Sequence, residues 1–72
     1  MLPIISGRIA ARVFMKIGYR IVRQRGSHIR LGHPLKRSLT IPDHKTVGKG
    51  LLRKILRDAE LPVEDFINLL KK

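Results

Sequence analysis

Two short runs on either side of a glycine, residues 19–24 and 27–32, predict a β-hairpin in the first half of the chain. Each run mixes arginine with branched or aromatic apolar residues over about six positions, which is typical of strands. Gly26 lies between them and adopts the left-handed backbone of a tight turn without strain. A hairpin here would supply two neighbouring antiparallel strands of any sheet that the chain forms.

The pairing register of this hairpin has two possibilities. A two-residue loop, Arg25-Gly26, would place Val22 opposite Ile29. A three-residue loop over residues 24–26, with Gly26 as a bulge, would place Ile21 opposite Ile29. We favour the second, because it collects the apolar side chains on one face and a one-residue slip would scatter them. The opposite, open face would then carry Arg20, Val22, His28 and Arg30.

Hydrophobic periodicity and the residues that typically start or end helices and strands predict the other elements. Ser6 can cap a first helix, Gly18 ends it, Pro42 stops a third strand, and Pro62 suits the start of the last helix. The expected elements are a helix at about 7–17, strands at about 19–24, 27–32 and 37–41, and helices at about 49–59 and 62–71. This α-β-β-β-α order with a short extra helix is that of the double-stranded RNA-binding fold. We therefore expect one α+β domain over residues 1–72, with helices on one face of a three-stranded antiparallel sheet.

Both long helices are expected to bury one face and expose a basic one. The buried faces are assigned to Ile9, Ala10, Val13, Phe14 and Ile17 and to Leu51, Leu52, Ile55, Leu56 and Ala59. The basic faces carry Arg8, Arg12 and Lys16 on the first helix and Lys49, Arg53 and Arg57 on the second. Such stripes are either solvated faces or phosphate contacts, and the sequence leaves both readings open.

The charge distribution favours a polyanionic partner. The 72 residues contain 16 Lys and Arg against five Asp and Glu, a formal net charge of +11, and no cysteine. Every acidic residue lies after position 42. Such a surface concentrates phosphate backbones, so nucleic acid is preferred over a merely solubilising shell. The apolar start of the chain is too short for a signal peptide or a membrane span, so we expect a cytoplasmic protein that does not enter membranes.

Histidine is the residue to examine for catalysis. RNA carries its own nucleophile, the 2′-hydroxyl, so a general base, cations for the phosphorane and an acid for the leaving oxygen are sufficient. The carboxylates are too scattered for a metal-dependent nuclease, so no metal or other cofactor is expected. His28 lies among Arg23, Arg25 and Arg30, and could be catalytic or a plain surface histidine. His33 is more simply a turn residue, and His44 could supply an acid, contact phosphate or cap a loop.

Several motifs together resemble the HicA family of toxins. They are Gly18-Tyr19, the Arg23–His28 run ending in Gly-Ser-His, His33-Pro34, Ile41-Pro42-Asp43-His44, residues 50–56 and residues 63–66. The resemblance covers nearly the whole chain from about Ser6. It implies a fold like the double-stranded RNA-binding domain, ribonuclease activity that depends on His28, and a HicB antitoxin that covers the active face. Ser27 and Gly26 would then position His28. Glu60 and Pro62 depart from the family, which often has glycine and serine there.

The sequence therefore predicts a toxin that cleaves mRNA as a metal-independent endoribonuclease and is inhibited by a HicB-like antitoxin. His28 is the predicted catalytic base or acid. The predicted RNA-binding residues are Arg23, Arg25, Ser27, Arg30 and His44. Two alternatives remain: a non-catalytic RNA-binding module on the same fold, and a structural protein of the ribosome.

Overall fold

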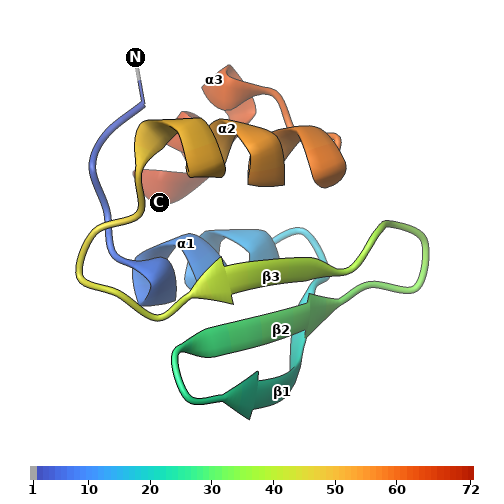
Figure 1. Cartoon of the computed structure of the whole chain (residues 1–72). Helices are drawn as coiled ribbons and strands as arrows, with labels where there is room; N and C mark the ends of the chain where they lie inside the picture. Colours follow the sequence, from blue (N-terminus) through green and yellow to red (C-terminus); the bar gives the residue numbers. More distant parts are fainter. Residues whose placement is uncertain (1) are drawn as a thin grey trace.

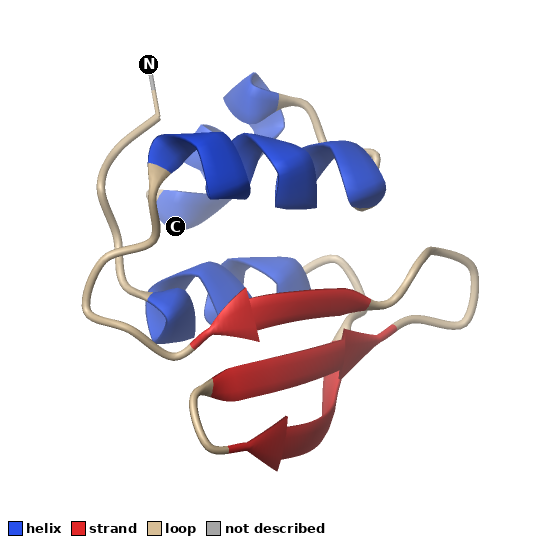
Figure 2. Ribbon diagram, in the orientation of Figure 1, coloured by secondary structure: helices blue, strands red, loops and turns tan. Residues whose placement is uncertain are grey.

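The computed structural model describes residues 2–72 and shows three helices and a three-stranded antiparallel sheet (Figure 1). The elements are α1 (Gly7–Met15), β1 (Arg20–Arg25), β2 (His28–Gly32), β3 (Leu39–Pro42), α2 (Lys49–Asp58) and α3 (Val63–Leu70). The strands lie in the order β1-β2-β3, and β1 forms the edge farthest from α2 (Figure 2). The predicted fold class, an α+β fold like the double-stranded RNA-binding domain, is confirmed.

The hairpin register differs from both predicted registers. Arg25 pairs with His28, so the loop contains only Gly26 and Ser27, and Gly26 has the expected positive φ of 52°. The pairing then shifts between Ile21 and Arg23. The inserted residue is Val22, which makes a β-bulge within β1 rather than at the turn. The bulge lets Ile21 face the helices while Arg23 and Arg25 both face away from them, a combination that strict alternation forbids.

The helices bury the three aromatic residues of the chain against the sheet. Phe14 lies at the centre, with ring centroids 5.9 Å from Tyr19 and 5.7 Å from Phe66, and all three rings are buried. Two predicted core residues are instead at the rim, because Ile9 is 41% and Leu51 42% exposed. The buried stripe of α1 runs through Ala10, Ala11, Val13 and Phe14, and that of α2 through Leu52, Ile55 and Leu56.

The segment before α1 completes the core, which the sequence did not indicate. Leu2 is 1% exposed, and the Val47 N–H donates to the Ile5 carbonyl (2.8 Å) in an isolated bridge. Ser6 then caps α1 as predicted, since its hydroxyl accepts from the Ile9 N–H (3.1 Å). The N-terminal strap therefore joins α1 to the loop that leads into α2.

The element boundaries differ from the predicted ones by one or two residues, the usual uncertainty at helix and strand ends. Helix α1 ends at Met15, before Gly18 with its φ of +103°. Glu60, which departs from the family pattern, has a φ of +55° after α2, a conformation that glycine adopts at about 1 kcal/mol less cost. Within residues 2–72, no helix has the length and apolar character needed to cross a membrane.

Candidate active site

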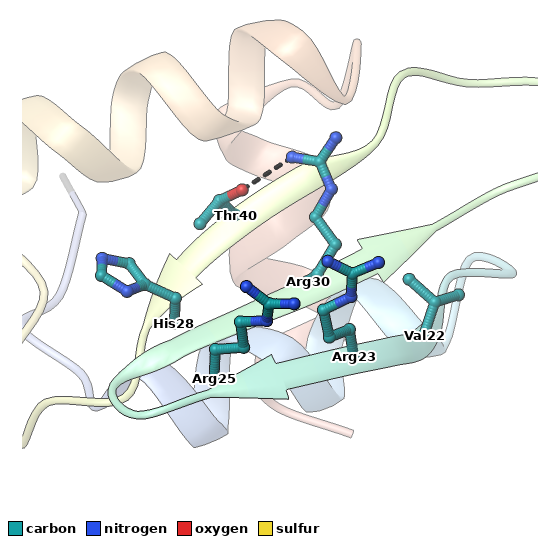
Figure 3. Close-up of a pocket in the computed structure, with 6 residues that line it drawn as sticks. All are labelled: Val22, Arg23, Arg25, His28, Arg30 and Thr40. Carbon is teal, nitrogen blue, oxygen red and sulfur yellow. Dashed lines mark hydrogen bonds between the residues drawn. The ribbon is translucent and has the colours of Figure 1, made fainter.

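The open face of the sheet carries a hollow of about 550 Å³ that we call the basic hollow (Figure 3). Its lining residues are Val22, Arg23, Arg25, His28, Arg30 and Thr40. All three strands contribute, and four of the six residues were predicted as site residues. Among residues 2–72, no carboxylate lines it, so the hollow favours an anionic ligand.

Strand pairing sets the positions of the charged residues. Arg25 lies directly opposite His28, and Arg23 directly opposite Arg30. Like charges on facing positions destabilise an antiparallel pair by up to about 1 kcal/mol. The bulge at Val22 is what turns Arg23 to this face. A bound anion between the guanidinium groups would relieve their repulsion, so the lining favours a negatively charged ligand.

His28 stands at the open end of this hollow. Its side chain is exposed, and within residues 2–72 its imidazole makes no hydrogen bond. Figure 3 shows the ring on the same side of the sheet as Arg25 and Arg30. Both ring nitrogens are therefore free to give or take a proton at a ligand held by the arginines.

Arg30 is oriented by a hydroxyl on the neighbouring strand β3. Its Nη1 donates to the Thr40 hydroxyl (2.8 Å), and the two residues lie opposite each other on β2 and β3. The other guanidinium N–H groups make no hydrogen bond within residues 2–72, so they remain available to phosphate oxygens. Thr40 is thus a positioning residue, recognisable only once the register of β2 against β3 is known.

Asp43 fixes the position of the hairpin from the helix side of the sheet. Its carboxylate accepts from Arg8 Nε and Nη2 (3.1 and 3.2 Å) and from Gln24 Nε2 (3.0 Å). Its backbone N–H donates to the Ser27 carbonyl (2.6 Å). One residue therefore ties α1, β1 and the hairpin loop next to His28. In the sequence, Asp43 is distinguished only as part of the Ile41-Pro42-Asp43-His44 motif.

The other two predicted RNA-binding residues lie outside the basic hollow. Ser27 is exposed in the hairpin loop, and His44 is exposed beyond β3. The backbone carbonyl of His44 accepts from the Gly7 N–H (2.9 Å), so its backbone has a structural role at the start of α1. A phosphate contact by either side chain would require RNA to extend past the end of the hairpin.

His33 is a structural residue, as the turn interpretation predicted. Its Nε2 donates to the Ile17 carbonyl and its Nδ1 accepts from the Leu35 N–H, both at 3.0 Å. The ring also packs edge-on against Tyr19, with centroids 4.8 Å apart. Because both nitrogens are occupied, His33 is not available for acid–base chemistry.

The structure separates the two basic stripes. On α1, Arg8 is paired with Asp43, and Lys16 Nζ donates to the carbonyls of Leu69 and Lys72 (2.7 and 3.0 Å). On α2, Lys49, Arg53 and Arg57 are exposed, and no hydrogen bond or ion pair joins their side chains to residues 2–72. The α1 stripe is thus largely used within the fold.

Within residues 2–72, no three histidine or acidic side chains cluster as a metal site would require.

The fold and the open face together define a small α+β protein with a cationic, histidine-bearing sheet surface. A family model described as the HicA toxin of bacterial toxin–antitoxin systems matches residues 7–61. The chain therefore belongs to the HicA toxin family, and the predicted resemblance is confirmed. Membership makes the protein a toxin that has an antitoxin partner. None of the curated proteins matches the chain.

Proposed function

We propose that this toxin is a metal-independent endoribonuclease that cleaves mRNA with His28 as the acid–base residue. The observation that carries the proposal is the free imidazole of His28 beside three guanidinium groups in a hollow without a carboxylate. Family membership supports a toxic activity, and the cationic lining supports a polyanionic substrate. Since mRNA is the proposed substrate, the protein would act in the cytoplasm.

The proposed reaction uses the 2′-hydroxyl of RNA as the nucleophile. Neutral His28 takes the hydroxyl proton while the 2′ oxygen forms a bond to phosphorus. Arg23, Arg25 and Arg30 stabilise the extra negative charge on the phosphorane oxygens. The bond from phosphorus to the 5′ oxygen then breaks, and that oxygen gains a proton, returned from the imidazolium or supplied by water. The products are a 2′,3′-cyclic phosphate and a 5′-hydroxyl end.

His28→Ala tests this mechanism directly. Because the side chain is exposed and unbonded within the described chain, its loss should leave the unfolding temperature unchanged. Cleavage of RNA should fall by about 10²–10⁴-fold, the usual contribution of a positioned acid–base group, while RNA affinity changes little. Added imidazole should restore part of the rate, because the open hollow admits it. Unchanged cleavage by the variant would refute the assignment.

The non-catalytic alternative gives a different result in the same assay. A binding module would bind RNA without cleaving it, whereas the proposed enzyme should cleave RNA in the presence of a metal chelator. Analysis of the ends should find cyclic phosphates. Loss of all cleavage on chelation would contradict the metal-independent mechanism.

We propose a HicB-like protein as the antitoxin, acting by covering the basic hollow. The hollow contains three arginines and no acidic residue, so the covering surface should present carboxylates. The complex should be inactive and its affinity should fall with added salt. Ser27 and His44 remain predicted contacts at the rim, for RNA or for this partner.

A further inference from the structure

A second hollow adjoins the basic hollow on the open face of the sheet. It measures about 510 Å³, and we call it the outer hollow. Its lining residues are Gly18, Arg20, Val22, Gly32, His33 and Pro34. Val22 lines both hollows, so its side chain forms the wall between them.

The bulge in β1 and a glycine in β2 build this wall together. Gly32 pairs with Arg20, next to the point where Val22 is inserted. A Cβ at Gly32 would lie 3.1 Å from Val22 Cγ1, so the valine side chain occupies the space over the glycine. Yet Val22 remains 62% exposed, and the core does not need it. An apolar side chain held in this way between arginines is available to a ligand.

The other walls supply an apolar surface and one positive charge. Pro34 and the fixed ring of His33 form the far side, and Gly18 leaves room for that ring, since a Cβ there would lie 2.9 Å from His33 Nε2. Arg20 provides the cation. Arg20 and Arg25 stand at opposite ends of β1, roughly 15 Å apart along a strand, so one phosphate group cannot reach both.

We propose that the outer hollow is a second nucleotide subsite, next to the one in which cleavage occurs. The apolar side chains of Val22 and Pro34 contact the base or ribose of a neighbouring nucleotide, and Arg20 binds its phosphate. Single-stranded RNA then runs along β1 from Arg25 towards Arg20, with Val22 between two successive nucleotides. This inference rests on the proposed function, because it assumes that RNA binds the basic hollow.

Two variants with different physical signatures test the subsite, with binding of a labelled single-stranded RNA measured by fluorescence anisotropy over a range of salt concentrations. Arg20→Gln should weaken binding and make the negative slope of log affinity against log salt less steep by about 0.7, the value for one phosphate contact on a single strand. Val22→Ser should weaken binding about fivefold without changing that slope, because an apolar contact releases no counterion. Lys71→Gln removes the same charge from the end of α3 and should change neither quantity.

The outcomes distinguish the subsite from the catalytic proposal. Wild-type protein and Arg20→Gln should cleave a dinucleoside monophosphate, whose one phosphate lies in the basic hollow, equally well. Both variants should cleave longer RNA less efficiently than wild type. Affinities and slopes equal to those of wild type would overturn the subsite, even if His28→Ala abolishes cleavage. Full activity of His28→Ala would instead overturn the catalytic assignment and leave the subsite standing. Arg20 is exposed and forms no part of the core, so its variant decides the matter if Val22→Ser fails to fold.

Discussion

Gly7 is the glycine at which a single added methyl group should lower the stability of the fold most. It is the first residue of α1 and is buried against the end of β3. A Cβ placed there would lie 1.8 Å from the Pro42 carbonyl oxygen and 3.3 Å from the Asp43 Cα. These are backbone atoms, which cannot rotate away as a flexible side chain can. In Gly7→Ala, α1 and β3 must therefore move apart.

The expected loss of stability follows from the hydrogen bond and the packing contact that this separation disturbs. The Gly7 N–H bond to the His44 carbonyl (2.9 Å) would lengthen, at a net cost of about 1 kcal/mol. Forcing a methyl group into a packed contact costs about 1–3 kcal/mol more. Together these predict a loss of about 2–4 kcal/mol, a large part of the stability of a small domain. At about 4–8 °C per kcal/mol, Tm should fall by about 8–30 °C.

The matched control is the same substitution in α2. Gly50 lies one residue inside that helix, and a Cβ there meets nothing within 4 Å. Gly50→Ala should therefore stabilise the protein, by up to about 1 kcal/mol, through backbone entropy and helix propensity. Urea denaturation followed by circular dichroism measures both variants. A Gly7→Ala loss below 1 kcal/mol, or the same sign for both variants, would refute the packing argument.

Two further predictions concern pH and the hairpin support. Burial, and then the carboxylates of Glu60 and Asp58, raise the pKa of Tyr19 above its ordinary value of 10.0. The neutral phenol, which donates to the Arg37 carbonyl (2.8 Å), is thus favoured by folding. Its contribution to stability should be complete below about pH 10 and lost as the pH rises through the folded-state pKa. Tyr19 is the only tyrosine, so its ultraviolet absorbance reports the titration, and a midpoint at or below 10.0 in the folded protein would contradict the reasoning. Asp43→Ala should cost about 1 kcal/mol, since its exposed partners regain water, but should slow single-turnover RNA cleavage severalfold by loosening the hairpin. A rate unchanged from wild type would show that the hairpin holds His28 without this carboxylate.

The sequence predicted the elements of this fold well because each has a local signal. Ser6 marks the start of α1, Gly18 its end, and Gly26 the hairpin turn, and the structure confirms all three. The aromatic core was also predictable, because Phe14 and Tyr19 fall at apolar positions of the helix and the sheet. Such signals depend only on residues that are close in the chain. A single sequence was therefore sufficient to predict where the helices and strands lie.

The bulge at Val22 could not be predicted from the same signals. Placing the bulge at the turn and placing it within β1 both put Ile21 on the helix side with Ile29. They differ in whether Gln24 or Arg25 shares the face of His28, and a polar residue at an edge strand carries no pattern that decides this. Asp43 provides the missing information, since its carboxylate holds Gln24 on the helix side. That contact joins residues 19 positions apart, so only the folded chain reveals it.

The open face and the core divide the tasks of stability and ligand binding between the two sides of one sheet. Every residue of β1 is exposed, and Arg23 is paired with the like-charged Arg30, so the hairpin gains little from its own outer face. Its position is maintained instead from the helix side, by the Asp43 contacts and by the close approach of Gly7 to Pro42, the residue that pairs with His28. An anion on the outer face adds favourable contacts where the free protein has repulsion. The same cations that weaken the free hairpin therefore strengthen its hold on a polyanion, and a surface so arranged is better suited to binding a ligand than to stabilising the fold.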